Sequence, residues 1–221
     1  LYKNLSYDPL KDFEPIGLAV AYSYTLMGRK DLPFNTLAEL VAYARANPGK
    51  LTFASAGNGS GQHILAAALW HLAGVQLTHV PYRGAQPAYT DLLGARVDVF
   101  FDLSSTARPH VDAGSVKPLA VSGAARLPIH PSVPTLRETG VAPLELESWF
   151  GYFAPAKTPV AELNRLRTEL RKVITAPDVV ERFEKAGGRP MAVMGDDAKA
   201  LQKRDIDRWV PLIKAAGIQP E

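Results

Sequence analysis

The sequence contains no cysteine among its 221 residues. This absence excludes a disulfide scaffold, a thiolate nucleophile and a zinc site with cysteine ligands. The five histidines show neither H-x-x-x-H nor H-E-x-x-H spacing, so a histidine zinc site has little support. We therefore expect neither a metal nor a cofactor. The compartment stays open, since cysteine-free chains occur in both periplasm and cytoplasm.

Long apolar runs and blocks of like charge are also missing. No apolar run approaches the roughly 20 residues that cross a bilayer, and the stretch 64–74 is interrupted by His71. The net charge of +3 comes from interspersed residues, without the basic stripe of a nucleic-acid reader. The chain opens at Leu1 without an initiator Met or an apolar leader, so we expect an internal or processed start.

Short β-rich apolar runs alternate with segments of helical period, a pattern that predicts an α/β protein with a mostly parallel sheet. Thr36 and Glu39 form a capping box that opens the first helix. Two extended passages, 22–28 and 149–153, are candidates for crossing a hinge between two lobes. Strands are expected at 16–20, 24–28, 51–54, 78–80, 97–101, 117–122 and 149–153.

Helices are expected between these strands and towards the end of the chain. Thr158 and Pro159 suit the start of a helix, and Asp178 and Asp196 begin two later ones. In the helix after Pro159, one apolar face is predicted to contain Leu163, Leu166, Leu170 and Val173. The other predicted helices cover 62–73, 87–93 and 106–113.

The loop Ser55–Gly61 is the most informative local feature, because it follows a strand, precedes a helix and consists of small residues. A helix amino terminus carries partial positive charge and unpaired N–H groups, so it can hold a carboxylate or phosphate. Gln62 replaces the third glycine of G-x-G-x-x-G, and neither a P-loop Lys nor G-x-S-x-G is present. The alternative is a permissive turn that binds nothing.

Two further strand ends carry polar residues, and the carboxyl ends of parallel strands line ligand crevices. Arg83 can pair with a carboxylate, and Tyr82 can stack on a ligand or donate its hydroxyl. Equally, they can be a surface arginine and a half-buried tyrosine. Asp102 can accept from a ligand, although capping the next helix is the commoner role of a lone Asp. His63 falls in the first turn after the loop, where a satisfied, partly buried histidine is the commoner outcome.

Several segments resemble the Bug (TctC) family, the periplasmic solute-binding receptors of tripartite tricarboxylate transporters. Residues 7–13, YDPLKDF, resemble the Y-D-P-x-K-D-F segment of that family. The resemblance extends over essentially the whole chain in family order. It is carried by NPGKL at 47–51, the loop 55–61 with His63, HVPYRG at 79–84, DLLG at 91–94, LAVS at 119–122, VPT at 133–135, WFG at 149–151, APA at 154–156 and IKAAGI at 213–218.

The resemblance implies a periplasmic binding-protein fold, type II-like, with two α/β lobes and a hinge. Residues 1–22 and 148–221 would form the remainder of lobe 1, and residues 23–147 a complete lobe 2. Family members begin with a signal peptide, a first strand and a Pro- and Gly-rich ligand loop, so we expect lobe 1 to be incomplete. The implied ligand-binding residues are Ser55, Gly57, Asn58, Gly59, Ser60, Gly61, His63, Tyr82, Arg83, Gly84 and Asp102.

The resemblance also implies a non-enzymatic receptor in the periplasm, which binds a small carboxylate and hands it to membrane transporter subunits. A dicarboxylate, an acidic amino acid or an aromatic acid would suit it. Two alternatives remain open: a sensory module for a membrane partner, and an enzyme that uses His63 or Asp102 as a general base. An incomplete lobe would expose apolar surface around Trp149, Phe150 and Phe153, which predicts self-association.

Overall fold

The computed structural model describes residues 4–219, which divide into two compact units. Unit 1 contains 4–22 and Trp149–Pro211, and unit 2 contains Ser23–Ser148 together with Leu212–Gln219. The sequence analysis placed lobe boundaries after Tyr22 and before Ser148, and the division into lobes stays a prediction. Residues 212–219, which we expected in lobe 1, group with unit 2.

Two strands carry the chain between the units. β1 (Phe13–Arg29) is a single strand of 17 residues, where the sequence suggested two separate extended passages. The unit boundary falls inside it, between Tyr22 and Ser23. β6 (Glu147–Pro155) contains the second boundary, after Ser148. The two passages proposed as hinge crossings therefore belong to the strands that change unit.

Unit 2 is built on a five-stranded sheet in the order β3-β2-β4-β1-β5. β2 runs parallel to β3 and β4, whereas β1 runs antiparallel to β4 and β5. Since β4 and β5 both run antiparallel to β1, four of these five strands point in one direction, so the expectation of a mostly parallel sheet is confirmed and β1 is the reversed strand among them. The bounds of its other strands are β2 (Thr52–Ser55), β3 (Thr78–Pro81), β4 (Val99–Leu103) and β5 (Val116–Val121).

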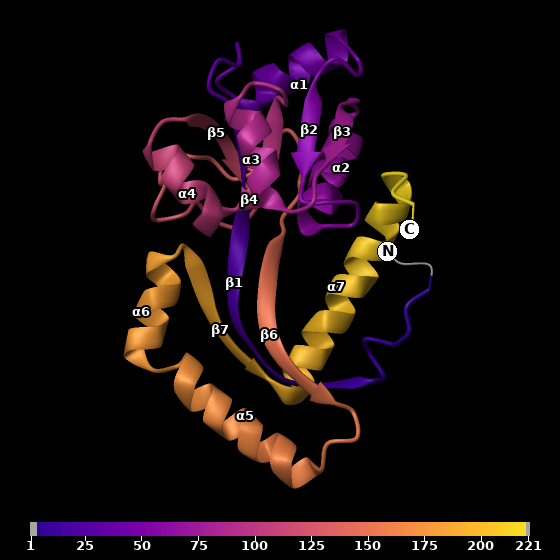
Figure 1. Cartoon of the computed structure of the whole chain (residues 1–221), viewed down its shortest axis with the longest axis vertical. Coiled ribbons are helices and arrows are strands. Elements are labelled where there is room, and N and C mark those ends of the chain that lie inside the picture. Colours follow the sequence, from indigo (N-terminus) through magenta and orange to yellow (C-terminus); the bar gives the residue numbers. More distant parts are fainter. Residues whose placement is uncertain (1–3, 220–221) are drawn as a thin grey trace. The chain divides into compact units, whose positions relative to one another are not determined.

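Helices cover both faces of this sheet (Figure 1). Phe53 of β2 packs edge-on against Trp70 of α2, while its neighbour Ala54 joins the core cluster of Ala88 in α3. Successive strand residues face opposite sides, so α2 and α3 lie on opposite faces. The predicted capping box of Thr36 and Glu39 is confirmed at α1. The helices are α1 (Leu37–Ala46), α2 (Gly61–Ala73), α3 (Ala85–Leu93) and α4 (Ser104–Asp112).

Ser122 forms hydrogen bonds both to β1 and to the segment that leads into β6. Its fully buried hydroxyl accepts from the Tyr24 N–H at 2.8 Å and donates to the Leu146 carbonyl at 2.5 Å. The Ser122 backbone bonds the same two residues, each at 2.8 Å. One residue thereby holds β1 beside the segment that leads into β6.

Unit 1 pairs the first half of β1 with β6 and, antiparallel, with β7 (Gly188–Met194). The sequence analysis did not predict β7, because Gly187 and Gly188 were interpreted as a break after the preceding helix. Pairing with residues 17–22 of β1 supplies the strand's hydrogen bonds instead. The unit's helices are α5 (Val160–Ile174), α6 (Pro177–Lys185) and α7 (Gly195–Ala215), whose residues up to Pro211 belong to this unit.

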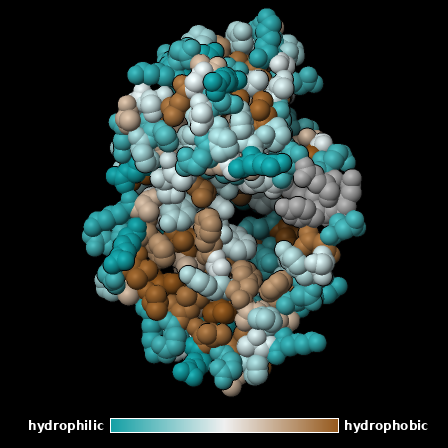
Figure 2. Space-filling model, viewed as in Figure 1, coloured by the Kyte–Doolittle hydropathy of each residue, from teal (hydrophilic) through white to brown (hydrophobic). Residues whose placement is uncertain are grey.

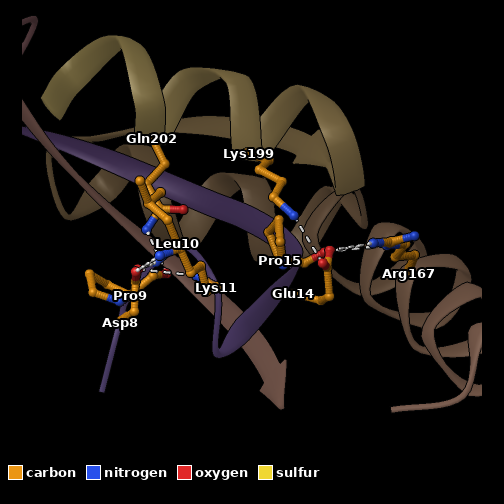
Figure 3. A network of polar contacts seen from close by, with 9 residues as sticks. All are labelled: Asp8, Pro9, Leu10, Lys11, Glu14, Pro15, Arg167, Lys199 and Gln202. Atoms are coloured by element: carbon orange, nitrogen blue, oxygen red, sulfur yellow. Dashed lines mark hydrogen bonds and ion pairs between the residues drawn. The ribbon is translucent and has the colours of Figure 1, made fainter. Parts of the chain in front are cut away.

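Polar contacts fasten two of these helices to the start of β1 (Figure 3). Glu14 accepts from Lys199 of α7 at 2.9 Å and lies 4.0 Å from the guanidinium of Arg167 in α5. The same guanidinium donates to the Pro15 carbonyl at 3.1 Å. Just before β1, the Asp8 carboxylate accepts the Leu10 N–H at 2.9 Å, a turn that lowers the pKa of Asp8. This is the structural role of the family-like segment 7–13.

Unit 1 keeps much apolar surface uncovered. Leu163 and Ile174 of α5 are buried, but Leu166 and Val173 are exposed, so only part of the predicted apolar face is covered. In β6, Phe150 and Tyr152 are exposed, whereas Trp149 and Phe153 are half-buried. Figure 2 shows apolar surface over the part of unit 1 where Figure 1 draws β6, β7 and α5. Self-association through this surface stays a prediction.

Candidate ligand-binding site

The loop Ser55–Gly61 connects the end of β2 to the start of α2. Ser60 is the N-cap residue of α2, and its hydroxyl accepts from the His63 N–H at 3.3 Å. The N–H groups of Gly61 and Gln62 lie in the first turn, where helix geometry provides no carbonyl acceptor. With the partial positive charge of the helix end, they form a place for a negatively charged group.

Internal hydrogen bonds shape this loop. The Gly57 N–H donates to the Ser55 hydroxyl at 3.2 Å, and the Gly59 N–H donates to His63 Nδ1 at 3.1 Å. The Ser60 N–H donates to the Gly57 carbonyl at 3.2 Å. Gly57 and Gly59 have φ of +133° and +72°, values that L side chains rarely adopt. The small residues are therefore required by the backbone path of the loop.

The turn Tyr82–Gly84, after β3, lies directly beside the loop. The Tyr82 N–H donates to the Ser55 carbonyl at 3.0 Å, and the Gly84 N–H donates to the Ala56 carbonyl at 3.2 Å. These bonds continue the parallel pairing of β2 and β3 beyond the strands. Two strand ends selected from the sequence are thus brought together. Arg83, the cation of the turn, is exposed.

Tyr82 uses its hydroxyl within the protein. It donates to Asp91 at 2.7 Å, and the same carboxylate pairs with Arg96 at 2.7 Å. Burial, followed by the hydrogen bond to Asp91, raises the pKa of Tyr82 to about 12. The hydroxyl thus helps to hold the turn on α3, and the aromatic face is the part of Tyr82 that a ligand would have to use.

Asp102 connects the end of β4 to the first turn of α2. Its side chain is buried, and Oδ1 accepts from Gln62 Nε2 at 3.0 Å. The N-cap residue of α4 is Leu103, so the interpretation of Asp102 as a helix cap is wrong. Burial and the charge of Asp102 raise the pKa of Tyr89. A buried carboxylate two residues before α4 therefore fixes Gln62 beside the loop.

His79 of β3 is a residue of this site that the sequence did not single out. Its Nε2 lies 2.7 Å from the Ser55 hydroxyl. Its ring stacks on His63, with centroids 3.9 Å apart and an 8° angle, and on Phe53 at 4.8 Å. Burial, with the neighbouring His63, lowers the pKa of His79 to about 4. The alternation of residues in β3 indicates on which face of the strand His79 lies. The register that pairs His79 with Phe53 cannot be predicted from the neighbouring sequence.

The structure gathers the loop, His63, the turn 82–84 and Asp102 at one end of the unit 2 sheet. Among residues 4–219, no group of three or more His, Asp or Glu side chains has a metal-binding arrangement. Within the same described range, no helix is both long and apolar enough to span a bilayer. The gathered features are backbone N–H groups, hydroxyls, imidazoles, the guanidinium of Arg83 and the carboxylate of Asp102.

Comparison with known protein families gives a match over residues 1–218 to the family described as "Tripartite tricarboxylate transporter family receptor", TctC. The chain belongs to the TctC family. Its assignment confirms the resemblance seen in segments such as 7–13 and 79–84. A curated TctC-like relative, the "UPF0065 protein in tcbD-tcbE intergenic region" of Pseudomonas sp. (strain P51), is 40% identical over 218 residues. That match covers 96% of this chain and 63% of the relative, so the chain spans less than two thirds of the relative's length.

Solved structures show that the TctC assignment and the fold agree. "Structure of periplasmic binding protein BugD" is 34% identical, with a TM-score of 0.90, and the match covers 100% of this chain and 75% of BugD. "R. palustris Rpa4515 with adipate" is 31% identical, with a TM-score of 0.88, and the match covers 100% and 74%. The mixed α/β fold of periplasmic binding proteins is therefore confirmed for this TctC-family chain.

Proposed function

We propose that this TctC-family chain is part of a periplasmic receptor that binds a small carboxylate, most suitably a dicarboxylate, and presents it to membrane transporter subunits. One observation carries the proposal: the strand-to-helix loop of unit 2 ends in the first turn of α2, whose N–H groups have no carbonyl acceptor within the helix, beside a second backbone turn. Support comes from the similar Rpa4515 protein, whose structure holds adipate.

Backbone N–H groups suit this ligand class. A carboxylate is an acceptor with a full negative charge, and it is stabilised at a helix amino terminus without a dedicated cation. Gly59 and Gly61 bring no side chain that would keep a ligand away from the backbone. Since the helix is 13 residues long, its partial charge at Gly61 is well developed.

The side chains are proposed to select among carboxylates. Exposed Arg83 is placed to pair with a second carboxylate of the ligand, as the fork of its guanidinium allows. Asp102 would disfavour a second carboxylate beside the side-chain amide of Gln62, so it would set how a diacid is oriented once its first carboxylate is at the backbone of α2. A non-enzymatic role fits the family, whose members are receptors.

Titration calorimetry with adipate, and with the uncharged adipamide as matched control, tests the proposal on full-length protein. The expected result is binding of the diacid and at least tenfold weaker binding of the diamide, because charge-assisted hydrogen bonds are about twice as strong as neutral ones. Amide NMR should place the largest shifts at residues 57–62. Equal binding of both compounds, or shifts confined elsewhere, would contradict the site.

A further inference from the structure

We propose that His79 is a positioning residue for the loop Ser55–Gly61, acting on Gly57 through the Ser55 hydroxyl and on Gly59 through the stacked ring of His63. The inference rests on the proposed function, because it takes this loop as the part that binds the ligand. It adds a residue from β3 that neither caps the helix nor belongs to the loop.

The bonds of Ser55 assign the proton on His79. The Ser55 hydroxyl donates its one proton to the Gly57 carbonyl at 3.1 Å and accepts from the Gly57 N–H at 3.2 Å. A third partner at 2.7 Å, His79 Nε2, must then donate to the same oxygen. All three bonds exist together only when Nε2 of His79 carries a hydrogen.

The bond to His63 assigns a second proton. His63 Nδ1 accepts from the Gly59 N–H at 3.1 Å, so this nitrogen is unprotonated and the hydrogen of neutral His63 is on Nε2. The two imidazoles lie almost parallel with centroids 3.9 Å apart. The geometry therefore describes two neutral rings of the same tautomer, stacked face to face.

The stack explains why His79 stays neutral. Two imidazolium ions at this separation would repel, and the buried ring of Phe53 lies beside both, with its centroid 4.8 Å from that of His79 and 6.3 Å from that of His63. The titratable group that acts on His79 is His63, and the other contacts of its ring come from Phe53 and Ser55 of β2. Burial with this neighbour depresses the pKa of His79 well below neutrality.

The hydrogen bonds of the Gly57 and Gly59 amides fix the backbone conformation of the loop that leads into α2. Both glycines have positive φ, a conformation that a free glycine shares with many others. The Gly57 N–H donates to Ser55, whose hydroxyl bonds to His79. The Gly59 N–H donates to His63, whose ring stacks on His79. Removing the donor at residue 79 should therefore loosen two loop amides at once, although His79 bonds neither of them directly.

Three variants of the full-length protein separate the parts of this role. His79→Phe keeps an aromatic ring beside Phe53 and His63 but has no donor for Ser55. His79→Gln loses the ring but restores an N–H donor near the Nε2 position. His71→Phe is the matched control, since His71 is an exposed histidine farther along α2.

The first readout needs no ligand. In His79→Phe, hydrogen exchange at the Gly57 and Gly59 amides should accelerate about tenfold, a change of about 1.4 kcal/mol that is within the range of one lost hydrogen bond. His79→Gln should restore most of the protection, and His71→Phe should match the wild type. Nitrogen NMR of the wild-type imidazoles should show both rings with hydrogen on Nε2. Unchanged exchange in His79→Phe, or a hydrogen on Nδ1 of His79, would overturn the assignment.

The second readout is calorimetry with adipate. His79→Phe should bind about tenfold more weakly, and His79→Gln should lie within about threefold of the wild type. If the wild type binds no carboxylate, the proposed function fails while the exchange and tautomer data still test His79. If the wild type binds and His79→Phe binds equally well with loosened glycine amides, the function stands, but the order that His79 gives the loop does not contribute to ligand binding and the proposal is overturned.

Discussion

The hydroxyl group of Tyr24 stands directly over Gly61, in the space that the β-carbon of any other residue at position 61 would need. Tyr24 belongs to β1 just after the unit boundary, and Gly61 is the first residue of α2. The contact couples the strand that enters unit 2 to the amino terminus of the helix in the proposed site.

This contact predicts the effect of Gly61→Ala. The added methyl group would displace the Tyr24 hydroxyl, and overpacking of this kind costs roughly 1–3 kcal/mol of unfolding free energy. Tyr24→Phe removes the clashing oxygen, so the double variant Tyr24→Phe/Gly61→Ala should recover part of the loss in urea unfolding. Gly114→Ala is a poor control because its φ is positive, whereas Ala125→Ser at an exposed position is a suitable one. Additive losses in the double variant would contradict the clash.

Ser122 provides a second prediction, on stability. Ser122→Ala leaves the Tyr24 N–H and the Leu146 carbonyl without the hydroxyl that serves both, in a fully buried position. The free energy of unfolding should fall by about 1–3 kcal/mol. Exposed Ser132→Ala should change it by less than about 0.5 kcal/mol. Equal effects of the two substitutions would show that the hydroxyl of Ser122 is dispensable.

The exposed Arg83 allows a direct test of its proposed contact. Arg83→Ala should weaken adipate binding about tenfold, the value of one charge-assisted hydrogen bond, and the loss should shrink in high salt. Arg137→Ala, an exposed arginine elsewhere in unit 2, is the matched control. An unchanged affinity in Arg83→Ala would show that the guanidinium of Arg83 does not contribute to ligand binding.

His79 predicts a specific dependence of stability on pH. Its pKa is about 4 in the folded protein and about 6.5 in an unfolded chain, so the unfolded state binds the proton first as the pH falls. The free energy of unfolding of the wild type should therefore decrease between about pH 6.5 and pH 4, relative to His79→Gln. Urea unfolding of both proteins across this range measures the difference between their free energies of unfolding. The titration of carboxylates contributes equally to both proteins and so does not affect this difference. A difference that does not vary with pH would refute the lowered pKa.

The exposed side chains of β6 predict self-association. Phe150 and Tyr152 are 48% and 59% exposed, and apolar surface of this kind drives contacts between molecules. Sedimentation velocity at rising concentration should show oligomers that decrease in Phe150→Asn/Tyr152→Asn. Leu93→Asn, which changes an exposed apolar residue of unit 2, should leave them unchanged. A wild type that stays monomeric at all concentrations would contradict the predicted self-association.

Local sequence determined much of the candidate site. The capping box of Thr36 and Glu39 marked the start of α1, and the small residues 55–61 marked a loop before a helix. Gly57, Gly59 and Gly84 all have positive φ, as residues without a β-carbon can adopt most easily. Turn preferences and helix periodicity depend on neighbours within a few residues, which is why a single chain displays them.

Only the tertiary structure decided how the pieces meet. The direction of β1 and the existence of β7 depend on pairing across the sheet, and hydrophobic runs do not encode pairing. The bonds of Ser55 to His79 and of Gln62 to Asp102 join residues 24 and 40 positions apart. Each depends on strand register, which shifts every side chain to the other face when it slips by one residue. The sequence thus specified which residues stand at the strand ends, and register determined which of them touch.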